Sequence, residues 1–198
     1  VHLGVAGKAF GVGATLGLME EEGNLLGGAS GGALSASHAQ TFFTVLRGHL
    51  DFAKHWSLIG KYTHGLTFAD DYEKSLLSNF SQIESNSWGM GLAGRHVFSR
   101  GDQLGFGVSQ PLRTIDGDVE VSTPYWDPMR ARVGFNSTRT SLVPNGLETS
   151  LEFFYRKPIS KRAQFITYMV LRDEPLHRAE RGAQASVIGV VRWRFGSR

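Results

Sequence analysis

Residues 185–195, near the C-terminal end of the chain, alternate apolar and polar side chains with a period of two. The apolar members are Val187, Val191, Trp193 and Phe195, and the polar members among them are Ser186, Arg192 and Arg194. This alternation predicts a β-strand with one face toward an apolar medium and the other toward water. A soluble barrel can also end in this way. An aromatic residue that finishes the last strand is, however, typical of bacterial outer-membrane β-barrels, where it lies in the aromatic girdle.

The same alternation recurs along the chain in strand-like segments separated by turn residues. The clearest segments cover residues 10–20, 41–52, 56–68, 88–98, 104–109, 119–122, 129–135, 147–156 and 164–171. We expect the chain to reverse at Asp116-Gly117-Asp118, which is a strong hairpin sequence, and again at Pro144-Asn145-Gly146. Residues 70–79 are the clearest candidate for a helix.

Short connections alternate with longer ones at residues 27–37, 70–84 and 173–182. A meander of about nine or ten such strands closes into a barrel, and outer-membrane barrels have short turns on one rim and long loops on the other. We therefore predict an all-β fold: an antiparallel up-and-down meander that closes into a transmembrane β-barrel of about 10–12 strands, either incomplete at its N-terminal end or smaller. Residues 1–198 would form one β-barrel domain, the C-terminal part of a longer protein.

Charged residues recur on one face of the predicted strands. We expect the following polar residues to face a water-filled lumen: Arg47, Asp51, Lys61, Arg95, Arg130, Arg132, Glu148, Glu152, Arg156, Arg192 and Arg194. In a soluble core, each of these charges that lacked a partner would cost several kcal/mol. A watery lumen removes that cost, and this argument favours the membrane barrel.

Aromatic residues gather near the ends of the predicted strands, on the opposite face. We expect the following to face lipid or to form the aromatic girdle: Phe52, Trp56, Phe68, Trp88, Phe98, Phe106, Phe153, Tyr155, Trp193 and Phe195. Trp and Tyr favour the headgroup level of a membrane because one end of the ring system is apolar and the other is wet. The alternative is that these are core aromatics of a soluble β-protein.

Small residues share the predicted polar face with the charges. They are Gly11, Gly13, Gly17, Gly89, Gly91, Gly105 and Gly107. One interpretation is that they leave room for a helix or an extended chain threaded through the lumen. The other is that they relieve curvature in a tightly closing sheet, and the sequence does not choose between the two.

Composition narrows the class of protein only modestly. The 198 residues include no cysteine, which removes disulfides and thiolate metal sites from consideration. The net charge of +3 is spread along the chain, whereas a nucleic-acid surface would cluster it. No apolar run is long enough for a transmembrane helix. The mean hydropathy of −0.17 resembles that of a soluble protein, but a barrel exposes only alternate residues to lipid.

Signals for catalysis are weak. Residues 89–94 match the spacing GxGxxG, but they lie within a strand pattern, where a dinucleotide site is not expected. Asp116, Asp118 and Glu120 could hold a cation, although a turn explains them better. The seven histidines have no metal-ligand spacing, and no GxSxG nucleophile motif occurs. We therefore expect no enzyme activity, no metal and no cofactor.

Several segments carry a family resemblance. They are Trp56-Ser57-Leu58-Ile59-Gly60, residues 104–113 (LGFGVSQPLR), residues 151–159 (LEFFYRKPI) and the closing Arg192-Trp193-Arg194-Phe195. Over about residues 10–195, the chain resembles the C-terminal translocator region of bacterial autotransporters, particularly those with a subtilisin-like serine protease as passenger. The resemblance implies a barrel of about twelve strands with a helix in its lumen, which anchors the protein and takes part in moving the passenger to the cell surface.

The chain departs from this family pattern in two respects. Fewer than twelve strands are predicted with no linker helix before the first, and the subtilisin-type active-site motifs are absent. Any protease activity would therefore belong to a passenger domain outside this chain. The expected function is a non-enzymatic outer-membrane translocator and anchor in a Gram-negative bacterium. Its partners would be membrane lipid, the barrel-assembly machinery and its own passenger, with no nucleic acid. The alternatives are a small outer-membrane barrel with a structural, adhesion or pore role, and a soluble β-barrel that binds an apolar ligand.

Overall fold

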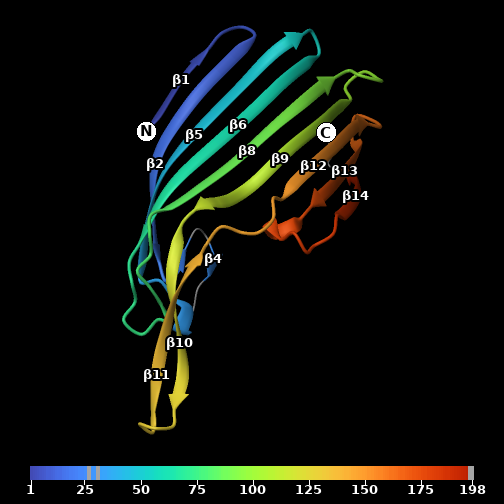
Figure 1. Ribbon diagram of the computed structural model, residues 1–198. Helices are drawn as coiled ribbons and strands as arrows, with labels where there is room; N and C mark the ends of the chain where they lie inside the picture. The colour runs from blue at the N-terminus through green and yellow to red at the C-terminus, as the bar shows by residue number, and fades with distance from the viewer. Residues whose placement is uncertain (26–27, 30–31, 196–198) are drawn as a thin grey trace.

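A computed structural model describes residues 1–25, 28–29 and 32–195, and these residues are mostly in strands (Figure 1). The strands are β1 (His2–Ala6), β2 (Phe10–Glu22), β3 (Asn24–Leu25), β4 (Gly28–Ala29), β5 (His38–Ala53), β6 (Trp56–Ala69), β7 (Leu77–Ser78), β8 (Ile83–Arg95), β9 (Gln103–Asp116), β10 (Asp118–Asp127), β11 (Arg132–Ser141), β12 (Thr149–Pro158), β13 (Ala163–Asp173) and β14 (Gln184–Trp193). The helical elements of the described residues are two short 3-10 turns, η1 (Gly32–Leu34) and η2 (Pro175–His177).

Nine of the strands form one antiparallel sheet. Their order is β1-β2-β5-β6-β8-β9-β12-β13-β14, so each strand of this sheet lies beside the next one in the chain. Every ladder between neighbours is antiparallel, as consecutive hairpins require. The predicted all-β, antiparallel up-and-down meander is therefore confirmed, although the described residues place nine strands in the sheet rather than about 10–12.

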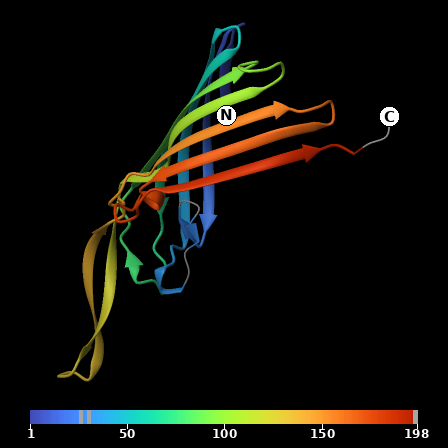
Figure 2. The same cartoon turned by 90° about the vertical axis from the view of Figure 1, so that its right-hand side faces the viewer.

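The sheet is curled, and its two outer strands are β1 and β14. Figures 1 and 2 show β1 and β2 on one side of the curve and β12, β13 and β14 on the other, with the middle strands between them. Within the residues that the structure describes, no ladder joins β1 to β14. The predicted closure into a barrel is thus not observed, and the sheet is an open, curved wall with two edges.

The connections confirm the predicted difference between the two rims. At one rim, short turns at residues 7–9, 54–55, 96–102 and 159–162 join neighbouring strands of the sheet. At the other rim lie the longer connections, including residues 70–82 and 174–183. We call these the short-turn rim and the long-loop rim, and they are at the top and bottom of the sheet in Figure 1.

The hairpin reversal expected at residues 116–118 is wrong. Gly117 has φ of 139°, which an L side chain rarely adopts, and it joins β9 to β10 without reversing the chain. The strand continues past the sheet, and the reversal comes at residues 128–131, between β10 and β11. These two strands form a hairpin that projects from the long-loop rim (Figures 1 and 2), and β7 pairs with its base.

The second expected reversal, at residues 144–146, is also wrong. This segment connects β11 in the projecting hairpin to β12 in the main sheet, where β12 pairs with β9. The Arg113 side chain of β9 donates hydrogen bonds to the backbone carbonyls of Pro144 (3.1 Å) and Gly146 (3.1 Å). Pro144, Asn145 and Gly146 therefore form an irregular connection between two strands instead of a reversal, and the hydrogen bonds from Arg113 fix its backbone.

The predicted helix over residues 70–79 is wrong as well. These residues form a turn followed by β7, which pairs with β10 in the projecting hairpin. The Asn79 N–H donates to the Asp71 carboxylate (3.0 Å), so the polar side chain is used for a loop contact. A segment of this length gains little from a helix in isolation, and Leu77 and Ser78 instead pair with Val121 and Glu120 of β10.

The sheet has very little core. Among the described residues, the buried apolar side chains are Ala36, Ala39, Ile83, Leu104, Val119 and Ala163. Its strands contact mainly their neighbours in the sheet, so no second layer built from the described residues covers either face. The fold is therefore a single curved layer, and the character of its two faces decides which surroundings it suits.

Candidate functional site

The candidate site is the nine-stranded sheet itself, because its two faces differ in chemistry. Side chains that are register partners across antiparallel strands point to the same face. One register row crosses eight strands and consists entirely of apolar side chains: Phe10, Leu50, Leu58, Leu92, Phe106, Phe153, Met169 and Val187. We call the face that carries this row the outer face.

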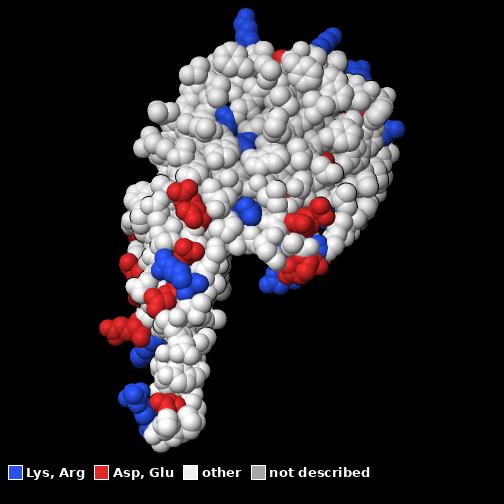
Figure 3. Space-filling model, viewed as in Figure 1, with Lys and Arg blue, Asp and Glu red and all other residues white. Residues whose placement is uncertain are grey.

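The outer face continues as an apolar surface on both sides of this row. The neighbouring row toward the long-loop rim contains Val5, Val12, Gly48, Gly60, Met90, Val108, Leu151, Leu171 and Ala185. Many large side chains of the outer face are exposed, and Phe106 in the first row, for example, is 50% accessible. In Figure 3, which views the convex side of the sheet, this region is almost free of charged residues. Soluble monomers rarely expose a contiguous apolar patch of this extent.

The opposite face, which we call the inner face, carries the charged residues of the sheet and many small ones, together with apolar side chains such as Ile59, Phe154 and Ile188. Its central row contains Gly4, Gly13, Arg47, Lys61, Gly89, Ser109, Ser150, Arg172 and Gln184. A hollow of about 370 Å³ lies on this face over Gly89, Gly91, Gly105 and Gly107, beside Lys61 and Glu152. Gly89 and Gly107 leave space here, whereas the side chains of Phe154 and Ile59 lie over Gly105 and Gly91 and form part of the wall of the hollow.

The charged residues expected to face the lumen fall into two groups. Those on the inner face of the sheet are Arg47, Asp51, Lys61, Arg95, Glu152, Arg156 and Arg192. Arg194 follows the end of β14, where its N–H donates to the carbonyl of Arg162 (2.8 Å). Three of the inner-face charges have local partners: Arg47 donates to the Thr15 hydroxyl (3.1 Å), Asp51 accepts from the Ser57 hydroxyl (2.5 Å) and Glu152 accepts from the Tyr168 hydroxyl.

Three of the expected lumen positions are corrected by the structure. Arg130 lies in the turn at the tip of the projecting hairpin, where it pairs with Asp127 (3.8 Å), and Arg132 begins β11 of the same hairpin. Neither residue belongs to the nine-stranded sheet, because the strand continues through Gly117 instead of turning there. Glu148 precedes β12 and is buried with only 4% of its surface exposed, so it does not face open solvent.

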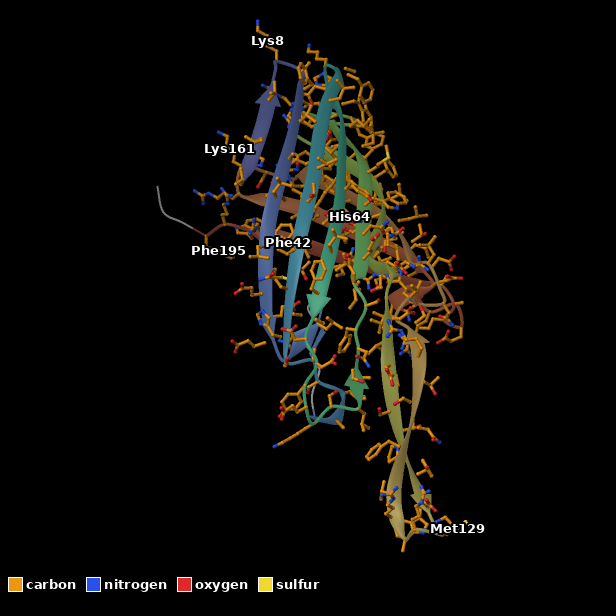
Figure 4. The ribbon with its side chains drawn as sticks, turned by 60° about the vertical axis from the view of Figure 1, so that its left-hand side comes forward. Lys8, Phe42, His64, Met129, Lys161 and Phe195 are labelled. Carbon is orange, nitrogen blue, oxygen red and sulfur yellow. The ribbon has the colours of Figure 1, made fainter. Side chains whose placement is uncertain are left out.

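The predicted lipid-facing aromatics also fall into two groups. Those on the outer face are Trp56, Phe68, Trp88, Phe106, Phe153, Tyr155 and Trp193. Phe52 lies at a bulge of β5, between Asp51 and Ala53, and has no register partner on β6. Phe98 lies instead in the turn between β8 and β9, where its ring packs edge-on against Tyr155 (5.9 Å between centroids), and Phe195 follows β14. Figure 4 labels Phe42, an outer-face residue that the sequence interpretation left out of the girdle and that packs edge-on against Phe68 (6.3 Å).

A buried polar cluster at the long-loop rim was not anticipated from the sequence. The Glu148 carboxylate accepts from the Leu176 N–H (2.7 Å) and lies 3.8 Å from the Arg172 guanidinium. The His177 ring accepts from the Glu148 N–H at Nδ1 (2.9 Å), so its Nε2–H donates to the carbonyl of Leu112 (3.0 Å). This cluster ties the β13–β14 connection to β9 and β12. The contacts span 24 to 65 residues of sequence, so no local motif signals them.

A second polar cluster organises the turn between β8 and β9. The buried Asp102 carboxylate accepts from the backbone N–H groups of Val97 (2.7 Å), Phe98 (3.0 Å) and Ser99 (2.7 Å). The Tyr155 hydroxyl also donates to it (3.2 Å). Burial alone would raise the pKa of Asp102, but the three backbone donors outweigh burial and hold the pKa below its ordinary value. The carboxylate therefore stabilises the turn in its ionised form.

The grouping of ionisable side chains in the described residues bears on metal binding. No group of three or more His, Cys, Asp or Glu side chains among them could hold a metal ion. Glu148 and His177 are close together, and both take part in structural hydrogen bonds, as does the Ser150 hydroxyl, which donates to the Glu148 carboxylate (3.4 Å). In the part of the chain that the structure describes, no helix is both long and apolar enough to span a bilayer.

Comparisons with known proteins give no relative for this chain. No protein-family model matches it, and neither any curated protein nor any solved structure matches it. The resemblance to autotransporter translocator regions therefore stays a prediction that depends on the quoted sequence segments.

Proposed function

We propose that this chain forms a membrane-spanning wall in the outer membrane of a Gram-negative bacterium and acts as the translocator and anchor domain of an autotransporter. The observation that carries the proposal is the outer face, where an uninterrupted apolar row crosses eight strands and six of its eight side chains are exposed. The hydrophobic effect favours covering such a surface by about 25 cal/mol for each Å² removed from contact with water. Lipid hydrocarbon can cover this apolar surface without a partner of complementary shape.

Membrane insertion makes a demand on the two edges of the sheet. An unpaired strand edge in hydrocarbon leaves backbone N–H and C=O groups without partners, each at a cost of several kcal/mol. The proposal therefore includes closure of the wall into a barrel, with β1 and β14 joined either directly or through further strands. A closed barrel has no edges, and its inner face becomes a polar lumen.

The translocator role draws on the inner face and on the family resemblance. The hollow over Gly89, Gly91, Gly105 and Gly107 leaves room beside the sheet for a threaded segment, and its mainly apolar wall carries the charged Lys61 and Glu152. The segments that resemble autotransporters lie on β6, β9, β12 and β14. On this proposal, a passenger crosses through the lumen or is displayed from it, and the barrel-assembly machinery recognises the closing aromatic strand.

The test uses the natural absence of cysteine, so that one introduced thiol can be labelled alone. Val108→Cys places a nitroxide spin label on the outer face of β9, and Ser109→Cys places it on the inner face of the same strand. In vesicles, the label at 108 should collide with dissolved oxygen and not with a water-soluble nickel chelate, and the label at 109 should show the reverse. Equal exposure of both labels to the chelate would refute membrane insertion. A chain that stayed monodisperse in buffer without detergent would favour the soluble, ligand-binding alternative.

A second candidate function is favoured by the projecting hairpin of β10 and β11. Its pairs Pro124–Phe135 and Trp126–Val133 place exposed apolar side chains on one side of the hairpin, and Met129 at the tip is 96% accessible. A small outer-membrane barrel that contacts other molecules with this hairpin would fit an adhesion role. Removing residues 122–137 should abolish adhesion on this second reading and leave passenger display intact on the first.

A further inference from the structure

The short-turn rim of the sheet carries an unusual concentration of positive charge. Its exposed cations, which we call the basic rim, are Lys8, Lys54, Arg95, Arg100, Lys157, Lys161, Arg162 and Arg194. They come from all four short turns and from the strand ends beside them. Figure 3 shows several of them as blue side chains along the upper edge, and Figure 4 labels Lys8 and Lys161. None of them takes part in an ion pair recorded among the described residues.

Negative charge is almost excluded from this rim. Of the acidic residues, Asp51 and Asp102 lie there, and both carboxylates are engaged, by the Ser57 hydroxyl and by the backbone of the β8–β9 turn respectively. Most of the other acidic residues lie at the long-loop rim and on the projecting hairpin: Glu20, Glu21, Glu22, Asp70, Asp71, Glu73, Glu84, Asp116, Asp118, Glu120, Asp127, Glu148, Asp173, Glu174 and Glu180. The two rims therefore have opposite electrostatic character, although the net charge of the chain is only +3.

The basic rim lies beside aromatic side chains of the outer face. Trp56 and Trp193 stand at this end of β6 and β14, next in the chain to the segments that carry Lys54 and Arg194. Phe98 is in the same turn as Arg100 and is 74% exposed. Aromatic rings prefer the headgroup level of a bilayer, and Lys and Arg extend from that level toward the phosphates while their methylene groups stay in contact with apolar surface.

We infer that the basic rim binds the phosphate groups of anionic phospholipids in the leaflet that it meets. This inference rests on the proposed membrane insertion and adds to it a lipid class and an orientation. The short-turn rim then faces the leaflet rich in anionic phospholipid, and the acidic long-loop rim faces the other side. Each Lys or Arg near an anionic surface changes the local lipid preference about fivefold, which corresponds to about 1 kcal/mol. Salt must weaken the effect because the cations are exposed.

The test compares two variants that lose the same amount of charge. The rim variant carries Lys8→Gln, Lys54→Gln, Lys161→Gln and Arg162→Gln, all in exposed turns. The control variant carries Lys74→Gln, Arg130→Gln, Arg178→Gln and Arg181→Gln. All four are exposed and lie away from the basic rim, in connections of the long-loop rim or at the tip of the projecting hairpin. Each protein is reconstituted in phosphatidylcholine bilayers that contain a trace of pyrene-labelled phosphatidylglycerol or pyrene-labelled phosphatidylcholine. Energy transfer from tryptophan then reports how strongly each labelled lipid is enriched around the protein.

The natural protein and the control variant should enrich labelled phosphatidylglycerol several-fold over labelled phosphatidylcholine, and the rim variant should lose most of this preference. Equal enrichment for the rim and control variants would overturn the inference, as would an enrichment in the natural protein that does not fall when salt is raised. The salt titration needs no substitution, so it decides the question even if a variant fails to fold. If the natural protein does not remain with the lipid after reconstitution, membrane insertion itself is contradicted. If it stays in the bilayer without enriching labelled phosphatidylglycerol, only this inference is contradicted.

Discussion

The substitution Phe106→Arg tests the sidedness of the sheet at a single position. Phe106 lies in the apolar row of the outer face between Leu92 and Phe153, and its ring centroid is 5.1 Å from that of Phe153. The next residue, Gly107, faces the inner side, opposite Glu152. Adjacent positions on one strand share the same depth and the same backbone pairing, so a difference between them reports the two faces.

The expected magnitude has two parts. Losing the aromatic pair costs about 0.5–1.5 kcal/mol. An Arg on the lipid face costs about 2–4 kcal/mol at the bilayer midplane and about 0–1 kcal/mol near the interface. The register row of Phe106 passes through Leu58, two residues along β6 from Trp56 at the strand end, which is about 7 Å at about 3.3 Å per residue. An intermediate lipid cost of about 1–3 kcal/mol follows, so we expect Phe106→Arg to lower folding stability by about 2–4 kcal/mol in total.

Gly107→Lys provides the matched comparison. A Cβ at this position would lie 3.6 Å from the Met90 carbonyl and 3.8 Å from the Glu152 Cβ, which are ordinary contacts. The new ammonium group would face the Glu152 carboxylate across the ladder. We therefore expect a change of less than about 1 kcal/mol.

The assay is urea titration of the protein folded in vesicles, followed by tryptophan fluorescence and by the folded band on unheated gels. Phe106→Leu separates the two parts of the cost, since it removes only the aromatic pair and should lose no more than about 1.5 kcal/mol. Equal losses for Phe106→Arg and Gly107→Lys, or a larger loss at Gly107, would refute the assignment of the faces.

Two further predictions concern the rims. Asp102→Asn should destabilise the protein at neutral pH. Because the pKa of Asp102 is lowered in the folded state, its contribution is present above the ordinary value of 3.8 and is lost as pH falls through the lowered value, so the two proteins should converge in acid, and a pH-independent difference would contradict this role. Gly117→Ala should cost about 1–3 kcal/mol and make the projecting hairpin more sensitive to protease, because φ is 139° and the new Cβ would lie 3.2 Å from Ile83. Gly182→Ala, with no atom within 4 Å of its added Cβ, should be neutral or slightly stabilising, and an equal loss in both variants would exclude backbone strain at Gly117 as the cause.

The sequence interpretation succeeded where the relevant information is local. Phe106 and Glu152 were assigned to opposite faces from alternation alone, and the ladders place them so. Successive side chains of any extended strand point to opposite faces, so this assignment needs no knowledge of distant residues. The antiparallel order and the unequal rims followed for the same reason, since short connections allow only neighbouring strands to pair.

It failed where the path of the chain depends on distant contacts. The Asp-Gly-Asp sequence at residues 116–118 is compatible with a tight reversal and with a bend. The chain bends here because the strand that follows, β10, pairs with β7 and β11. Arg130 and Arg132 were misplaced as a result. Glu148 and His177 are 29 residues apart in the sequence, and no local sequence pattern around either residue predicts their contact.

The amino-acid sequence alone is thus enough to specify a set of amphipathic strands, with an apolar face and a more polar face, because an extended backbone places alternate side chains on opposite faces. It does not specify the curl of the sheet, the projecting hairpin, the buried polar clusters that brace the rims, or the separation of positive and negative charge between those rims. Those properties arise from hydrogen bonds and packing between residues far apart in the chain. Such contacts contribute to stability only after the strands have come together.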